Sequence, residues 1–157
     1  MVQWLAGRGY CDSVALLKTK RMNGTIIIQR NELKATLQAI KESLEKRYDS
    51  SEPTNMLEIL EELSYLLGNS SLAEASAKYW LEEKKKVVIS EYVEKTPHKE
   101  RLQPLMLKDY ILSMCAAELA AYELATSQHS SLVHRIDSVR SALSYLKAEI
   151  SNINMGR

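Results

Sequence analysis

Apolar residues recur at alternating spacings of four and three over the last third of the chain, and this pattern constrains the fold more than any other feature. Its heptad phase places one apolar stripe along one side of a helix. It predicts a helix over about 105–150, which at ~1.5 Å per residue would be roughly 65–70 Å long. Residues 126–131 are poor helix formers, so two helices joined by a turn at 127–131 are the alternative. The stripe is Ile111, Cys115, Glu118, Tyr122, Ala125, His129, Leu132, Ile136, Val139, Leu143, Leu146 and Ile150.

Three further helices are predicted before this one from their caps and apolar stripes. The first follows an N-cap at Asn31 and carries one apolar stripe on a charged helix. The second is apolar on more than one face and ends at Gly68, which is typical of a left-handed C-cap. Ser71 and Glu74 match a capping box that begins the third. Their predicted ranges are about 32–48, 55–67 and 72–95.

Residues 1–30 are interpreted as an N-terminal extension of partly irregular structure, and 31–157 as one helical domain. A short helix over Val14 to Arg21 is followed by a break at Asn23-Gly24. The β-branched run from Thr25 to Ile28 fits either a short strand or an extended apolar segment across a helix surface. Because the run is isolated, we favour the extended segment.

Composition supports an all-α protein, a helical bundle or hairpin with a long heptad-patterned C-terminal helix. Five glycines and three prolines supply too few turns for a sandwich or a barrel. Cys11 and Cys115 lie far apart, which fits neither a disulfide framework nor a zinc ribbon and favours a reducing cytoplasm. Since no apolar stretch approaches the ~18 residues of a membrane span, no membrane association is expected.

The residues that carry chemistry in other proteins do not form a catalytic pattern here. His129 and His134 are five residues apart and point to different helix faces, so they make a poor metal pair. Ser131 and Asp137 share a helix with His134, but mid-helix amides are already bonded and cannot stabilise an oxyanion. We therefore expect no enzyme activity, no cofactor and no metal. His129 lies on the heptad stripe, where a buried polar residue that sets helix register is the favoured role.

The long stripe predicts a partner, because a chain of 157 residues is too short to cover a helix of that length. An exposed heptad stripe also favours aggregation unless it is paired. Either the helix of 72–95 runs back along the first half of the long helix while its end projects, or a second copy covers the rest. We favour the second copy and predict a homo-oligomer that also binds a protein partner. The predicted interaction seam is Leu132, Ile136, Val139, Leu143, Leu146 and Ile150.

A second surface of the same helix has the residues to bind nucleic acid or an acidic protein. Arg135, Arg140 and Lys147 are separated by serines, and Tyr145 is available to stack on a base. The same pattern is also compatible with an ordinary exterior. The formal net charge is +1, from 21 basic and 20 acidic residues, which argues against extensive coating of nucleic acid.

Residues 117–150 resemble the C-terminal half of a group of small helical proteins encoded by bacteriophages. In that group a helix with tyrosine and alanine leads to an arginine and then to a serine-tyrosine-leucine-lysine-acid ending. The resemblance extends over roughly residues 71–150. It implies a phage accessory protein in the cytoplasm of a bacterial host cell, either of the replication and recombination type or an inhibitor of host defence. The matching residues are Tyr122, Arg140, Ser144, Tyr145, Leu146, Lys147 and Glu149.

The hypothesis from the sequence is therefore a non-enzymatic helical accessory protein that acts through protein–protein contacts and self-assembly. The alternative is a DNA-binding accessory factor in phage replication or recombination.

Overall fold

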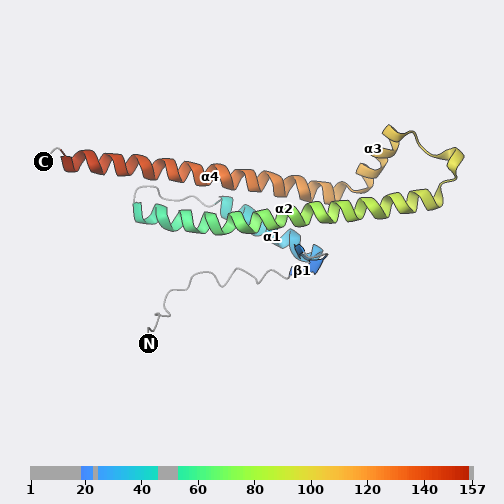
Figure 1. Ribbon diagram of the computed structural model, residues 1–157, viewed down its shortest axis with the longest axis horizontal. Coiled ribbons are helices and arrows are strands. Elements are labelled where there is room, and N and C mark those ends of the chain that lie inside the picture. The colour runs from blue at the N-terminus through green and yellow to red at the C-terminus, as the bar shows by residue number, and fades with distance from the viewer. Residues whose placement is uncertain (1–18, 23–24, 46–52, 156–157) are drawn as a thin grey trace, which may run out of the picture.

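Two long antiparallel helices that lie side by side form the frame of the protein (Figure 1). Helix α2 (Pro53–Lys95) leads away from the main core, and helix α4 (Ala116–Met155) returns along it. The C-terminal end of α4 extends beyond the first turn of α2 (Figure 1). The predicted all-α class with a long C-terminal helix is confirmed. The computed structural model describes residues 19–22, 25–45 and 53–155.

A third helix covers one half of this hairpin. Helix α1 (Arg30–Glu45) packs on both α2 and α4. It begins two residues before the predicted start, and the last three residues of the predicted range lie outside the described residues. The main hydrophobic core fills the space between the three helices. Its buried members are Ile28, Leu33, Leu37, Ile40, Ile59, Leu63, Ala73, Ala77, Ala125, Leu132 and Ile136.

A small β-hairpin precedes α1 and docks on α2. Strand β1 (Thr19–Met22) pairs antiparallel with strand β2 (Thr25–Ile28). The Ile28 N–H donates to Ser76 Oγ at 2.9 Å, and the Trp80 indole N–H donates to the Ile28 carbonyl at 3.0 Å. These two bonds satisfy the backbone of a residue that is completely buried.

The N-terminal prediction therefore needs two corrections. The run that ends at Ile28 is a strand, because it pairs with β1, a partner that the sequence pattern did not predict. The helix predicted over Val14 to Arg21 is wrong for its last three residues, which belong to β1. Its first five residues lie outside the described part of the chain.

Helix α2 does not end at Gly68, contrary to the sequence prediction. It continues for 43 residues, so Ser71 and Glu74 lie in its interior and form no capping box at its start. A helical glycine costs roughly 1 kcal/mol relative to alanine. Burial of apolar side chains along both halves of α2 outweighs that cost, because each contributes about 1.5–3 kcal/mol.

The predicted helix over 105–150 is divided, but not at 127–131, where the alternative prediction placed a turn. Helix α3 (Pro104–Met114) ends at Cys115, whose φ of −108° and ψ of 17° depart from helical values. Residues 127–131 are helical within α4, so the predicted alternative turn is wrong. A 3-10 turn, η1 (His98–Glu100), completes the connection between α2 and α3.

Because α2 is continuous through Gly68, the substitution Gly68→Ala should stabilise the protein. No atom lies within 4 Å of a Cβ built on Gly68, so a methyl group fits there without displacement. Because alanine is the better helix former, the free energy of unfolding should rise by roughly 0.5–1 kcal/mol. Urea denaturation followed by circular dichroism measures the change. A left-handed C-cap at this residue would instead make the variant less stable.

Candidate interaction site at the hairpin tip

The predicted interaction seam on α4 is mainly an internal seam. Leu132, Ile136 and Leu143 are buried against helices of the same chain, while Val139 and Leu146 are half-buried. From Leu132 to Leu143 the stripe is therefore covered within the chain, as the alternative with a helix running back along it predicts, and needs no second molecule there. Helices α1 and α2 cover it because the chain reverses direction at η1. Ile150, at 49% exposure, is the seam residue that stays open to solvent.

Polar residues of the α4 stripe also find partners within the chain. His129 Nδ1 lies 3.0 Å from the hydroxyl oxygen of Ser70 on α2, which fits a residue that sets helix register. The buried Glu118 forms an ion pair with Arg30, at the start of α1. Among the described residues, no group of three histidine, cysteine, aspartate or glutamate side chains is placed to hold a metal ion.

The predicted basic face does not assemble as one surface. The Arg135 guanidinium is half-buried and donates to the carbonyl of Leu44, near the end of α1. The last four carbonyls of a helix lack intrahelical donors and carry partial negative charge, so a cation there stabilises α1. Arg135 therefore holds α1 against α4 and does not extend the basic surface of α4.

The other three members of that face lie on the outside of α4. Tyr145 is 70% exposed, and Arg140 and Lys147 are exposed as well. Arg140 and Lys147 are seven residues apart and share a helix face. An Arg140 Nη1 to Asp137 Oδ1 distance of 3.9 Å places an acidic group beside them. What remains is a short surface with two basic residues.

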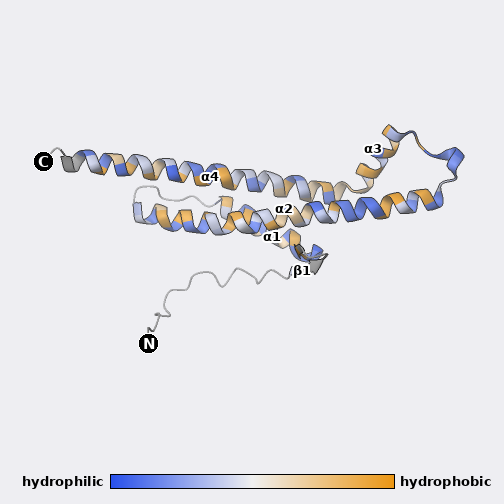
Figure 2. Cartoon of the chain, viewed as in Figure 1, coloured by the Kyte–Doolittle hydropathy of each residue, from blue (hydrophilic) through white to orange (hydrophobic). Residues whose placement is uncertain are grey.

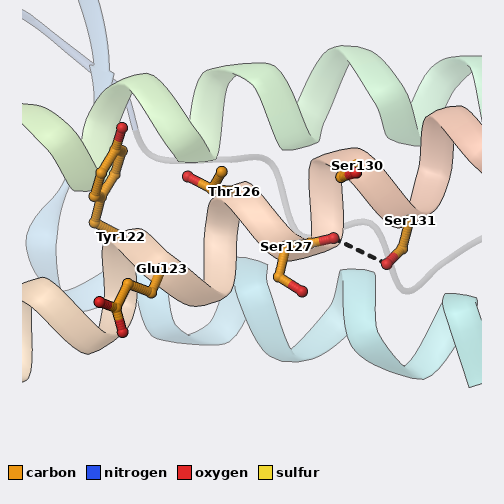
Figure 3. A pocket seen from close by; sticks show the side chains of 6 residues that line it. All are labelled: Tyr122, Glu123, Thr126, Ser127, Ser130 and Ser131. Carbon is orange, nitrogen blue, oxygen red and sulfur yellow. Dashed lines mark hydrogen bonds between the residues drawn. The ribbon is translucent and has the colours of Figure 1, made fainter.

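A shallow, open depression of about 440 Å³ lies along α4. Figure 3 shows the Ser131 hydroxyl directed at the carbonyl of Ser127, to which it donates at 2.9 Å. The Thr126 hydroxyl donates to the Glu74 carboxylate at 3.0 Å. The first bond lies within α4 and the second links α4 to α2, so neither hydroxyl is without a partner. The lining residues are Tyr122, Glu123, Thr126, Ser127, Ser130 and Ser131.

Exposed apolar side chains concentrate at the tip of the hairpin, formed by the end of α2, η1 and α3. Eight of the fifteen large hydrophobic side chains that are exposed in the described structure lie between residues 87 and 114. Large apolar patches of this kind mark interaction sites on soluble proteins. The eight residues are Val87, Ile89, Val93, Leu102, Leu105, Met106, Tyr110 and Met114.

Helix α3 is the most unusual part of the tip. Seven of its eleven residues are large and apolar, yet none of the eleven is buried. A helix that is apolar on most sides is normally covered on those sides. Ile111 packs in part on a small second core of Leu81, Val88 and Cys115, which holds α3 against α2. The opposite side of α3 has no cover within the described chain.

The exposed sides of α2 and α3 join into one surface, which we call the tip face. Its residues on α2 are spaced by three and four, and its residues on α3 are spaced by four, so each set lies on one side of its helix. The rings of Tyr92 and Tyr110 connect the two sides, with centroids 5.5 Å apart. The Tyr92 hydroxyl also accepts the Leu102 N–H at 2.6 Å, which ties the connection to α2. The tip face consists of Ile89, Tyr92, Val93, Met106, Tyr110 and Met114.

A charged band on α2, from Glu82 to Lys86, lies between the tip face and the main core. Glu82 pairs with Lys85 at 2.8 Å, and Glu83 pairs with Lys86 at 2.7 Å. The Glu83 carboxylate raises the pKa of the Lys86 amino group by hydrogen bonding and by its charge. Figure 2 shows this hydrophilic band in α2, followed by hydrophobic residues at the end of α2 and in α3. The apolar residues of the tip are thus a separate feature of the chain.

The sequence contained a signal for this site that the heptad pattern obscured. Apolar residues are dense over 87–93 and over 105–114. The first group was interpreted as the end of one helix and the second as the start of the long stripe. The break at Cys115 is what leaves one side of α3 without cover, and nothing in the residue pattern indicates that break.

Comparisons of this chain with protein-family models, with curated proteins and with solved structures found no match. None of the helices in the described ranges is long and apolar enough to cross a membrane.

Two arginines on α4 should respond differently to replacement by alanine. Arg135→Ala removes a charged hydrogen bond to the end of α1, and we expect it to lower the free energy of unfolding by about 1–2 kcal/mol. Arg140→Ala removes an exposed ion pair and should change the free energy of unfolding by less than about 0.5 kcal/mol. Urea denaturation of both variants tests this difference. Equal effects would mean that Arg135 does not hold α1.

Two isoleucines of the predicted seam test whether it is internal. Ile136→Asp places a carboxylate among buried side chains and should cost several kcal/mol, enough to unfold the chain. Ile150→Asp lies on an exposed part of α4 and should leave the melting temperature within a few degrees of wild type. Thermal denaturation followed by circular dichroism compares them. Comparable losses in both variants would indicate an intermolecular seam.

Proposed function

We propose that this chain is a non-enzymatic accessory protein that binds a protein partner through the tip face. The observation that carries the proposal is helix α3, an apolar helix with no buried residue that lies beside further exposed apolar residues of α2. All tip-face residues except Tyr92 are exposed, each with about half of its surface accessible. Together these five side chains present on the order of 500 Å² of apolar surface. A patch of that size is at the upper end for a monomer and favours a binding surface.

The hairpin is well suited to present such a surface. At ~1.5 Å per residue, a helix of the length of α2 spans about 65 Å, and it carries the tip face away from the main core (Figure 1). Met106 and Met114 suit a binding surface because their flexible, polarisable side chains adapt to a partner. Protein contact explains why these apolar residues lie outside the core.

The biological setting of the proposal comes from the sequence. The resemblance of roughly residues 71–150 to small phage proteins supports an accessory role in the cytoplasm of an infected bacterium. A DNA-binding role is the second candidate, favoured by the exposed Tyr145 beside Arg140 and Lys147. It has less support, because Arg135 is engaged with α1 and basic residues that contact phosphates dominate such affinity.

Affinity capture with a tip-face variant tests the proposal. Wild-type protein and the double variant Val93→Glu/Met106→Glu are immobilised and exposed to a bacterial lysate and to a labelled sample of the wild-type protein. Each replacement removes an exposed apolar side chain and adds a charge. The retained proteins should fall at least about tenfold, because two apolar contacts of about 1.5 kcal/mol or more are lost.

The double variant Leu124→Glu/Tyr145→Glu is the matched control, since it introduces the same two charges at side chains that are 44% and 70% exposed on α4, outside the tip. It should retain the same proteins as wild type, and all variants should keep wild-type helicity. The proposal is wrong if the tip-face variant retains every protein, including labelled wild type, as well as the unchanged chain does.

A further inference from the structure

We propose that the partner of the tip face is a second copy of this chain, bound through an antiparallel pairing of the two α3 helices about a two-fold axis. This inference rests on the proposed function of the tip face and names its partner. Three features of the tip support it: the symmetry of the exposed α3 stripe, the balance of charge around it and the area that it exposes.

The exposed stripe of α3 is complementary to itself. Met106, Tyr110 and Met114 are spaced by four residues on either side of the tyrosine, so the stripe reads the same in both directions. In a two-fold interface the same patch occurs on both molecules. An antiparallel pair centred on Tyr110 sets the two tyrosines side by side and each Met106 against Met114 of the second copy. Each tyrosine ring then lies one helical turn from methionines of both copies, and methionine sulfur makes favourable contacts with aromatic rings.

The charges around the tip face are balanced. Between residues 87 and 114 there are four acidic and four basic residues, so two tips can approach without net repulsion. A nucleic acid or an anionic membrane would select a basic excess, which this segment lacks. The acidic residues are Glu91, Glu94, Glu100 and Asp109, and the basic residues are Lys95, Lys99, Arg101 and Lys108.

The exposed area matches what a reversible dimer requires. With on the order of 500 Å² of apolar surface on each copy, pairing would bury about 1,000 Å², near the lower limit for a specific interface. Leu105, the most exposed of the large apolar residues of the tip at 72%, lies next to the stripe and adds to this area. A dimer of this size should dissociate on dilution.

Sedimentation velocity over a concentration range of about 1–200 μM tests the dimer. The mass of the wild-type protein should rise from 17.8 kDa toward twice that value. Tyr110→Asp places two carboxylates at the two-fold axis and should raise the dissociation constant at least about thirtyfold. Leu124→Asp is the control, because Leu124 is similarly exposed but lies on α4, outside the tip. It should dimerise as wild type does.

Disulfide trapping tests the register and does not depend on Tyr110→Asp being folded. In a Cys11→Ser background, Tyr110→Cys should form a disulfide-linked dimer with its own copy, because a two-fold axis brings identical residues together. Lys108→Cys is the control, since a residue two positions away points to a different side of α3. It should remain monomeric under the same oxidising conditions.

Three results would overturn the pairing. A wild-type chain that stays at 17.8 kDa throughout the range has no dimer. Equal trapping of Tyr110→Cys and Lys108→Cys contradicts the register. A dimer that survives Tyr110→Asp but is lost in Ile150→Asp forms through the end of α4. In each case the protein-binding proposal stands if Val93→Glu/Met106→Glu still loses captured bacterial proteins, and it falls only if that variant loses nothing.

Discussion

Burial of the apolar stripe of α4 against α1 and α2 is the interaction on which the rest of this structure depends. Leu132 and Ile136 lie in the main core with residues of both other helices. The same packing keeps α2 helical through Gly68, because several buried side chains outweigh the propensity cost of one glycine. It also orders α1, whose carbonyls at Leu37 and Leu44 accept hydrogen bonds from Gln128 and Arg135 of α4.

Because helices of the same chain cover that stripe from Leu132 to Leu146, the proposed interaction surface lies elsewhere. Beyond the charged band of α2, the end of α2 and helix α3 carry apolar residues. A small second core around Cys115 holds these two helices together. The change of direction at Cys115 turns one side of α3 away from the hairpin. The core thus confers stability and the tip face confers the proposed binding.

Several features were predictable because they depend on neighbours in sequence. The four-three spacing predicted a long helix and identified its inward side, as the burial of Leu132, Ile136 and Leu143 confirms. Gly68 misled the prediction, since an isolated helix would favour a stop there while a packed helix does not. The tip face was missed because Ile111 of α3 continues the heptad phase into Cys115, although α3 ends before that residue.

The amino-acid sequence by itself determined that the chain is helical and which side of its last helix is apolar, because both follow from local propensity and a periodicity of about 3.6 residues. Only the tertiary structure decided which helix covers that side. A heptad stripe binds a helix of the same chain or of another equally well, and the chain reversal at η1 places α2 there first. The reversal lies in the connection predicted between 95 and 105, but the break at Cys115, which also leaves α3 exposed, is encoded in no short pattern of residues.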